Sequence, residues 1–388
     1  MTDARSDGDQ GHWERNVIPF SDVAHSGPAY RTVGRLQVRE PHSPTEGRRM
    51  GRQIAMVFDL NKCIGCHTCS VACKVLWTNE DGRRDMWWCS VNTQPGRGTP
   101  RDYETMGGGY DAEGRVVLGA LPRPEDFGGA SQFNWNAVHT SGGNGSGHTH
   151  LQPTDRDPTW AMNWDEDQGA GEYPNAYYFY LPRICNFCSK PSCVDACPNG
   201  ALYKRDDFGV VLRDDSKCRG AQQCAQACPY KKIYFDTVTK TTRHCIGCFP
   251  RLEQGVAPAC VRQCPGRAVF VGYRDDATGP MHRLIERYQV ALPLHPEWNT
   301  EPNIFYVPPL SAFVVRPDGS IDESRRRIPL SYLESLFGPG VGPALRTLEE
   351  EMAKRKRGQP SELMDTLIAH QWQSLLGPFD HDPATIQW

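Results

Sequence analysis

The sequence predicts an α+β fold, with short strands arranged around four cysteine-rich loops and a helical C-terminal extension. Three observations lead to this prediction. Of the 16 cysteines, all except Cys89 fall into four runs with regular internal spacing. Short segments of strand-forming residues lie beside those runs. Amphipathic helical patterns follow them in the C-terminal part of the chain.

The cysteine spacing predicts iron-sulfur clusters. The first run has the spacing C-x2-C-x2-C-x3-C, which is that of bacterial ferredoxins, and Ala221 stands where regular spacing would place a further cysteine in the third run. Short loops of this kind wrap three thiolates around a compact inorganic core, while backbone N–H groups donate to its sulfurs. The runs are Cys63, Cys66, Cys69 and Cys73; Cys185, Cys188, Cys193 and Cys197; Cys218, Cys224 and Cys228; and Cys245, Cys248, Cys260 and Cys264.

The last cysteine of each run is expected to bind the cluster of another run, as in two-cluster ferredoxins, so the runs should come in pairs. Only residues 198–217 separate runs two and three, and we therefore pair run two with run three and run one with run four. The expected ligands are a first set of Cys63, Cys66, Cys69 and Cys264; a second set of Cys73, Cys245, Cys248 and Cys260; a third set of Cys185, Cys188, Cys193 and Cys228; and a fourth set of Cys197, Cys218 and Cys224.

The fourth set has only three thiolates. Alanine carries no ligand atom, so Ala221 leaves one iron corner without a protein ligand. We expect a 3Fe-4S cluster there, with an altered reduction potential, and 4Fe-4S clusters in the other three sets.

Short strands are expected beside the cysteine runs. Residues 53–58 predict a strand that leads into the first run, and residues 201–203 and 210–212 predict a hairpin after the second run. Further strands are expected at residues 232–235 and 268–273. Each cluster loop is then expected to lie between short strands, as in a ferredoxin-like repeat.

The C-terminal part predicts helices separated by an extended segment. Residues 281–288 have a helical pattern, and residues 290–310 form a stretch interrupted by prolines. Residues 331–334 have the spacing of a capping box at the start of a short helix. Residues 344–357 and 361–376 predict two further amphipathic helices, and the sequence leaves open whether they pack on their own domain or on a second subunit.

A long insertion separates the first two runs. A loop of this length within a compact domain is expected to contain some structure. In its glycine-rich part, His148 and His150 are expected to be exposed loop residues rather than metal ligands. We expect Cys89 to be a buried thiol rather than a ligand. The aromatic residues 177–180 are expected to pack against the cluster of the second run or against a partner.

Composition excludes some classes of partner. The net charge of -3 gives no electrostatic reason to expect nucleic-acid binding. No segment approaches the roughly eighteen apolar residues of a membrane span, so direct membrane insertion is not expected. The first fifty residues lack the apolar core of a signal peptide, and we expect an exported form of the protein to travel folded with a partner that carries the signal.

Other interpretations of the cysteines compete with electron-transfer clusters. Structural zinc sites do not need the staggered last cysteine of each run, and disulfides suit small secreted scaffolds. A catalytic cluster at the Ala221 corner would have only Gln222 or Gln223 as weak nearby ligands. Saturated clusters that pass electrons are therefore favoured, with a zinc-stabilised interaction module and a catalytic iron-sulfur protein as the alternatives.

The residues around the runs resemble the β subunits of membrane-associated nitrate reductases and of the related type II dimethyl sulfoxide reductase family, which includes ethylbenzene and dimethylsulfide dehydrogenases and selenate, chlorate and perchlorate reductases. The resemblance extends over residues 52–376. The segments that carry it are residues 56–69 (MVFDLNKCIGCHTC), 218–220 (CRG), 228–232 (CPYKK), 290–296 (VALPLHP) and 306–311 (YVPPLS).

This resemblance implies two ferredoxin-like modules and a role in relaying electrons. The pairing of runs assigns the parts of the chain to an N-terminal arm over residues 1–50, a first module of 51–73 and 232–275, an insertion over 74–184, a second module over 185–231, and a C-terminal extension over 276–388 that contacts partner subunits.

The resemblance also implies partner subunits. The expected α subunit carries bis-molybdopterin guanine dinucleotide and one further 4Fe-4S cluster, and the expected γ subunit, or another electron carrier, carries haem b. The first set is expected nearest the α subunit and the fourth nearest the haem. The complex is expected to be a periplasmic dehydrogenase, hydroxylase or oxyanion reductase, with a nitrate reductase or nitrite oxidoreductase on the cytoplasmic face of the membrane as the alternative.

Overall fold

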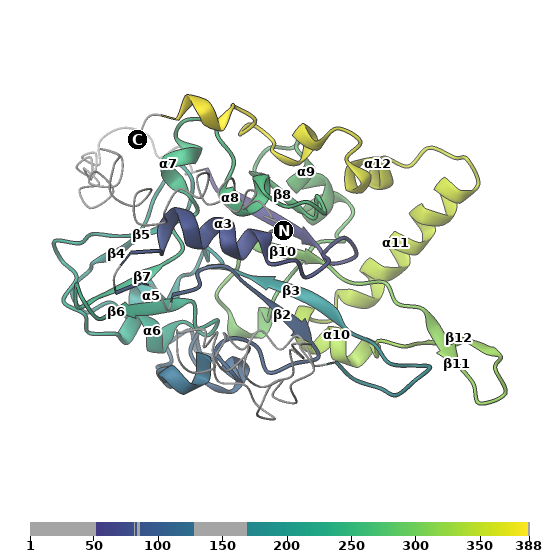
Figure 1. Ribbon diagram of the computed structural model, residues 1–388, viewed down its shortest axis with the longest axis horizontal. Helices are drawn as coiled ribbons and strands as arrows, with labels where there is room; N and C mark the ends of the chain where they lie inside the picture. The colour runs from purple at the N-terminus through teal and green to yellow at the C-terminus, as the bar shows by residue number, and fades with distance from the viewer. Residues whose placement is uncertain (1–51, 81, 84–85, 128–168, 387–388) are drawn as a thin grey trace, which may run out of the picture. The chain divides into compact units, whose positions relative to one another are not determined.

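The computed structural model describes residues 52–80, 82–83, 86–127 and 169–386. Residues 48–383 form one compact unit, and the fold is described for that unit (Figure 1). The expected N-terminal arm over residues 1–50 and the loop with His148 and His150 lie outside the described residues. Helices and strands are mixed along the described chain, which agrees with the predicted α+β class.

A four-stranded sheet lies at the centre of this unit. Its order is β8 (Val269–Tyr273), β1 (Ile54–Asp59), β10 (Ile304–Val307) and β9 (Leu292–Pro293). β1 pairs antiparallel with β8 and parallel with β10. Every residue of β1 is buried, because its apolar run, which ends in Asp59, is covered on both faces.

The expected strands at residues 53–58 and 268–273 are confirmed to within a residue. The stretch over residues 290–310, expected to be extended, supplies both β9 and β10 to the same sheet. The expected C-terminal extension therefore contributes strands to the sheet that leads into the first run.

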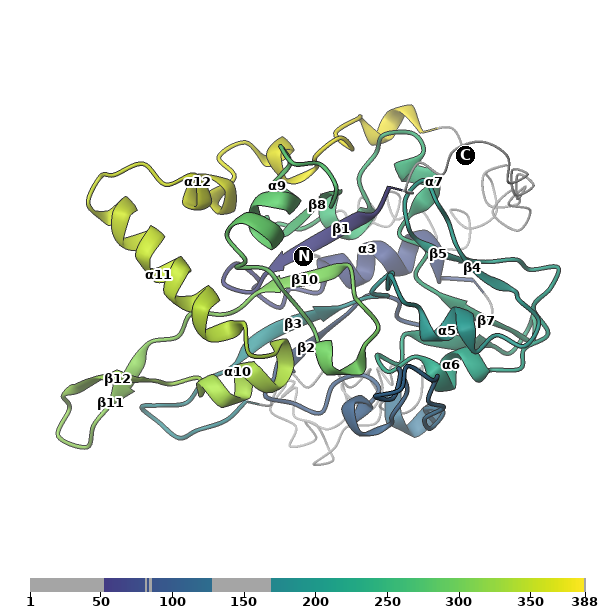
Figure 2. The same ribbon diagram turned by 180° about the vertical axis from the view of Figure 1, so that it is seen from behind.

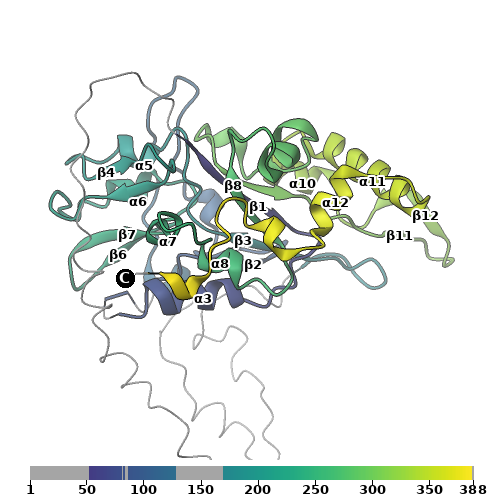
Figure 3. The same cartoon turned by 90° about the horizontal axis from the view of Figure 1, so that it is seen from above.

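Helix α3 (Thr68–Trp77) packs against the short α8 (Ala259–Arg262) beside the sheet (Figures 1 and 3). The first run ends in α3 and the fourth run passes through α8. A two-stranded ribbon of β2 (Ser90–Gln94) and β3 (Phe179–Arg183) joins the two ends of the long insertion. The expectation that the insertion contains structure is confirmed by this ribbon.

Two hairpins flank the second and third runs. They are β4 (Leu202–Lys204) with β5 (Val211–Arg213), and β6 (Ile233–Asp236) with β7 (Thr241–His244). The first hairpin and β6 confirm the sequence prediction. The short helices α5 (Ser192–Asp195) and α6 (Gln223–Ala227) pack side by side beneath them, and α7 (Phe249–Leu252) follows the start of the fourth run (Figure 1).

The C-terminal helices lie beyond the sheet. They are α9 (Pro280–His282), continued by a π-helical turn (Arg283–Arg287), then α10 (Leu330–Phe337), α11 (Val341–Lys356) and α12 (Glu362–Ile368) (Figure 2). The strands β11 (Phe313–Val315) and β12 (Ile321–Arg326) form a hairpin between them. Short 3-10 turns occur at Tyr103–Thr105, Pro124–Phe127, Pro296–Trp298, Trp372–Leu375 and Pro383–Thr385.

Two details of the predicted helices were wrong. The capping box does not form, because α10 begins one residue earlier, after Pro329, and Ser331 lies inside the helix without a capping hydrogen bond. The helix predicted over residues 361–376 ends at Ile368, where Ala369 adopts a left-handed φ of 47°. No described helix is long and apolar enough to span a bilayer.

Candidate iron-sulfur centres

All four cysteine runs begin with the same backbone turn. The residue two positions after the first cysteine has a positive φ in each run: Gly65, Phe187, Gly220 and Gly247. Glycine adopts this conformation without a steric penalty, which explains its presence in three of the four runs. The backbone N–H of each of these residues donates to the sulfur of the first cysteine of its run.

A second recurring hydrogen bond closes the far ends of runs two and four. The backbone N–H of Ala201 donates to Cys197 Sγ at 3.2 Å, and that of Ala268 donates to Cys264 Sγ at 3.4 Å. In both cases the donor lies four residues after the last cysteine of its run. Inward-pointing amides of this kind stabilise negative charge on sulfur.

The expected third set lies around one cavity. Cys185, Cys188 and Cys193 line it together with Cys228 from the end of run three. They meet there because α5 and α6 pack against each other. No other cysteine lines this cavity in the described part of the chain.

The expected second set lies around another cavity, in which Cys73 joins Cys245, Cys248 and Cys260. The packing of α3 on α8 brings run one and run four together here. Cys89 also lines this cavity and is 1% exposed, so the prediction that it is a buried thiol is confirmed.

The expected fourth set lines a third cavity, which contains Cys197, Cys218 and Cys224 together with Ala221. No side-chain donor stands at the Ala221 position, because its methyl group has no lone pair. Thr242 from β7 closes the opposite wall, and its hydroxyl lies 3.5 Å from Cys224 Sγ and 3.8 Å from Cys218 Sγ.

The cysteines of the expected first set act on one another electrostatically. Burial, together with nearby Cys69, Cys264 and Cys66, raises the pKa of Cys63 to about 12. Cys66 is exposed, and the neighbouring Ile64 side chain is 63% exposed. The first set thus reaches the surface of the described unit and contains its one exposed cysteine.

Neighbouring sets share elements of structure. α3 carries Cys69 of the first set and Cys73 of the second. Burial together with nearby Cys185 of the third set raises the pKa of Cys245 of the second set. α6 carries Cys224 of the fourth set and ends at Cys228 of the third. The four sets therefore follow one another in space in the order first, second, third, fourth.

Burial disfavours the ionised form of several of these thiols. Burial raises the pKa of Cys188 to about 12 and that of Cys224 to about 11, and it raises the pKa of Cys73 and Cys260 well above the usual range. Cys218 is different, because hydrogen bonds from Thr242 and Gly220 outweigh burial and lower its pKa. Iron ions supply the compensating positive charge in an iron-sulfur cluster.

The donor chemistry fits such clusters. The cysteines of each set offer sulfur ligands, and backbone amides point at those sulfurs. His244 is the one further potential ligand in the lining of the third-set cavity. In the described ranges no group of three or more His, Cys, Asp or Glu side chains is placed to hold a single metal ion. The cysteines instead surround cavities, which is an arrangement suited to a multi-atom core.

Three side chains near the sulfurs were not found from the sequence: Trp77, Thr242 and Lys232. Trp77 Nε1–H donates to Cys248 Sγ at 3.1 Å, and Lys232 lines the cavity of the third set. The residue types alone did not indicate a place near the sulfurs, because tertiary packing brings these side chains there.

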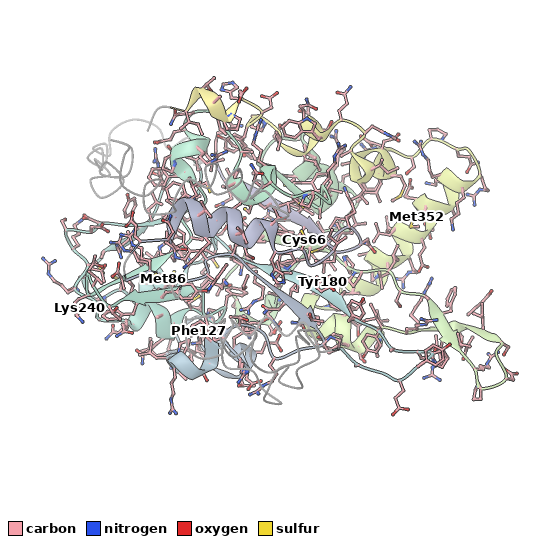
Figure 4. The ribbon with its side chains drawn as sticks, in the orientation of Figure 1. Cys66, Met86, Phe127, Tyr180, Lys240 and Met352 are labelled. Carbon is pink, nitrogen blue, oxygen red and sulfur yellow. The ribbon has the colours of Figure 1, made fainter. Side chains whose placement is uncertain are left out.

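Tyr180, which was expected to pack against the cluster of the second run or against a partner, contacts the first run. Its ring covers Gly65, where an added Cβ atom would lie 2.5 Å from the ring. Figure 4 labels Tyr180 and Cys66, the residue that follows Gly65.

Comparison with known proteins gives a consistent result. Residues 176–274 match a family described as a 4Fe-4S dicluster domain. Over 320 residues the chain is 52% identical to the dimethylsulfide dehydrogenase subunit beta of Rhodovulum sulfidophilum, covering 82% of this chain and 97% of the relative.

Two further relatives have almost the same identity. The selenate reductase subunit beta of Thauera selenatis is 52% identical over 322 residues, covering 82% of this chain and 97% of the relative. The respiratory nitrate reductase subunit beta of Haloferax mediterranei is 51% identical over 324 residues, covering 81% of this chain and 90% of the relative.

Proposed function

Because the chain belongs to the family of iron-sulfur β subunits of type II dimethyl sulfoxide reductase-like molybdenum oxidoreductases, we propose that it relays electrons through three 4Fe-4S clusters and one 3Fe-4S cluster. The observation that carries the proposal is the grouping of fifteen cysteines into four sets that follow one another in space. Clusters whose irons are held by thiolates exchange electrons without binding substrate.

The chain's own residues hold and insulate the clusters in this proposal. The fifteen cysteines are the iron ligands, in the four sets given above. Backbone amides at Gly65, Phe187, Gly220 and Gly247 stabilise the thiolates. The buried side chains around the second and third sets exclude water from the relay.

The partners follow from the position of the first set. Its exposed Cys66 and Ile64 support contact with a molybdenum α subunit, which would carry bis-molybdopterin guanine dinucleotide and one further 4Fe-4S cluster. The fourth set would then pass electrons to or from a haem b γ subunit or another carrier. Identities of 51% to 52% with a dehydrogenase subunit and with two reductase subunits give no preference for the direction of flow.

Anaerobic purification of the native complex tests this proposal, with metal analysis and low-temperature EPR on the same sample. We expect about fifteen irons in this chain, molybdenum in a co-purifying large subunit, and a three-iron EPR signal from the oxidised protein. Zinc without iron would support a zinc-stabilised interaction module instead. Turnover by the isolated chain would support a catalytic cluster.

The fourth set has a direct test in Ala221→Cys. The added thiol lies in the wall of the cavity that contains Cys197, Cys218 and Cys224. We expect the three-iron signal to disappear and the iron content to rise by about one per chain. Ala225→Cys is the control, because Ala225 lies four residues later, on α6, and outside that lining. A three-iron signal that persists in Ala221→Cys, or four-iron spectra alone in the unchanged protein, contradicts the assignment.

We propose a periplasmic location, with export of the folded chain together with its α subunit. A cytoplasm-facing nitrate reductase or nitrite oxidoreductase is the second candidate, and the 51% identity to a respiratory nitrate reductase subunit supports only the nitrate reductase part of it. Protease treatment of spheroplasts distinguishes the two. Degradation of the chain supports the periplasm, whereas protection until the cells are lysed supports the cytoplasmic face.

A further inference from the structure

A lysine lies buried inside the molecule without a carboxylate partner. Lys232 is 1% exposed, at the start of the β6 hairpin. Its Nζ donates to Ser90 Oγ at 3.0 Å, to the Trp87 carbonyl oxygen at 3.3 Å and to Tyr234 Oη at 3.3 Å. All three acceptors are neutral, so they solvate the ammonium group without compensating its charge.

Among the described residues, the anionic groups that act most strongly on Lys232 are cysteine sulfurs. Burial and the nearby Arg183 guanidinium lower the pKa of Lys232 to about 7, against the opposing effect of Cys89, Cys245 and Cys73. Among the described residues no Asp or Glu forms an ion pair with it. A buried, uncompensated charge is costly, so this lysine requires an anionic neighbour.

Lys232 lies between two of the cluster sets. Its side chain lines the cavity of the third set, together with Cys185, Cys188 and Cys193. Its charge also acts on Cys73 and Cys245, which belong to the second set. The ammonium group of Lys232 is therefore placed to act on both the second and the third cluster of the proposed relay.

We infer that Lys232 is a positioning residue for electron transfer, a fixed cation between the second and third clusters that raises the reduction potential of both. This inference rests on the proposed relay. Adding an electron makes a thiolate-bound cluster more negative, and a nearby cation stabilises that state. Because the same charge acts on both clusters, it shifts their potentials in the same direction and keeps the step between them small.

Lys204 provides a control, because it is a half-buried lysine whose Nζ is also held by neutral hydrogen-bond acceptors, although Glu301 acts on its charge as well. Its Nζ donates to the carbonyl oxygens of Phe187, Cys188 and Gly209. The cysteines that act on it, Cys188, Cys185 and Cys193, all belong to the third set. Its charge is thus directed at one cluster, whereas that of Lys232 is directed at two.

The experiment compares Lys232→Met, Lys232→Arg and Lys204→Met in the full-length chain, purified anaerobically with the subunits that assemble with it. Iron content and the EPR spectrum of each variant are measured first, and the midpoint potential of each cluster is then obtained by EPR-monitored redox titration. The unchanged protein tests the relay itself, since absence of clusters there refutes the proposed function independently of Lys232.

In Lys232→Met we expect two 4Fe-4S potentials to fall. Each should show at least a tenfold change in the equilibrium between oxidised and reduced forms, which is about 59 mV for a one-electron couple. In Lys204→Met only one of those two should fall, and the 3Fe-4S potential should stay unchanged in both variants. Lys232→Arg keeps the charge and should remain within a few-fold of the unchanged protein.

Several outcomes overturn the inference. Unchanged potentials in Lys232→Met with full iron content show that the charge has no effect on the clusters. Equal shifts in Lys232→Met and Lys232→Arg indicate a role in packing alone. If Lys232→Met loses iron, Lys232→Gln is titrated in its place, and loss of clusters in all the Lys232 variants assigns the lysine to folding and refutes its role in setting potentials.

Discussion

The indole Nε1–H of Trp77 donates a buried hydrogen bond of 3.1 Å to the Sγ of Cys248. Trp77 is the last residue of α3, and Cys248 lies 171 positions later in the fourth run. The same helix carries Cys73, which lines the cavity of the second set with Cys248. Both a ligand and a hydrogen-bond donor for this set therefore come from one helix.

Trp77→Phe should lower the reduction potential of the second cluster. A hydrogen bond to a ligand sulfur is stronger when the cluster is reduced and more negative. If the difference is about 1 kcal/mol, the potential falls by about 40 mV for a one-electron couple. EPR-monitored redox titration measures this shift. Trp88→Phe is the control, because Trp88 lines the same cavity but its Nε1–H donates to no acceptor among the described residues. Equal shifts in both variants contradict the role of the hydrogen bond.

Thr242→Val should lower the potential of the three-iron cluster. The Thr242 hydroxyl lies within hydrogen-bonding distance of both Cys224 and Cys218, and valine keeps the shape of the side chain while removing that donor. EPR-monitored redox titration measures this shift as well. The potential should fall by about 40 mV for each 1 kcal/mol by which the lost hydrogen bond had stabilised the reduced cluster relative to the oxidised one. Thr237→Val is the control, because Thr237 is exposed in the turn between β6 and β7 and lines none of the three cysteine cavities. A fall in Thr237→Val of the same size would assign the effect to the hairpin and not to the Thr242 hydroxyl.

Gly65→Ala should prevent assembly of the first cluster. Gly65 has a φ of 66°, and an added Cβ atom would lie 2.5 Å from the Tyr180 ring. The left-handed conformation alone costs an alanine about 1–2 kcal/mol, and the contact with the ring adds to this. Iron analysis should show a loss of about four irons per chain.

Gly319→Ala is the matched control for that change. Gly319 has a comparable positive φ of 84°, but no heavy atom lies within 4 Å of the added Cβ position. Its iron content should equal that of the unchanged protein. Full iron content in Gly65→Ala would show that the first run tolerates a side chain at this turn.

Ser361→Ala should destabilise the C-terminal helices by about 1 kcal/mol. The Ser361 hydroxyl accepts a hydrogen bond from the Met364 backbone N–H at the start of α12 and donates one to Glu351 of α11. The midpoint of denaturant unfolding, followed by circular dichroism, measures the loss. Ser331→Ala should leave the midpoint unchanged, because Ser331 lies within α10 and caps no helix. A larger fall in the unfolding midpoint for Ser331→Ala than for Ser361→Ala would contradict the capping role of Ser361.

Local patterns predicted the strands that lie next to the cysteine runs. The residues of β1, β4, β5, β6 and β8 are short apolar segments followed by turns, and such segments can be recognised without knowledge of their partners. β9 and β10 could not be recognised in this way, because prolines interrupt their stretch and β10 is held by parallel pairing with β1, about 250 residues away in the chain. The capping box failed because Pro329 already fixes the start of α10.

The sequence by itself determined the chemistry, since cysteine spacing limits which sulfurs can reach a common core and Ala221 removes one of them. Loop geometry also follows from the sequence, because glycine at the left-handed position turns an amide toward the first sulfur of its run. Only the tertiary structure decided which uncharged donors and which buried cation surround the sulfurs. Trp77, Thr242 and Lys232 reach them across long stretches of chain through the packing of α3, β7 and the β6 hairpin, and no local rule of spacing encodes such contacts.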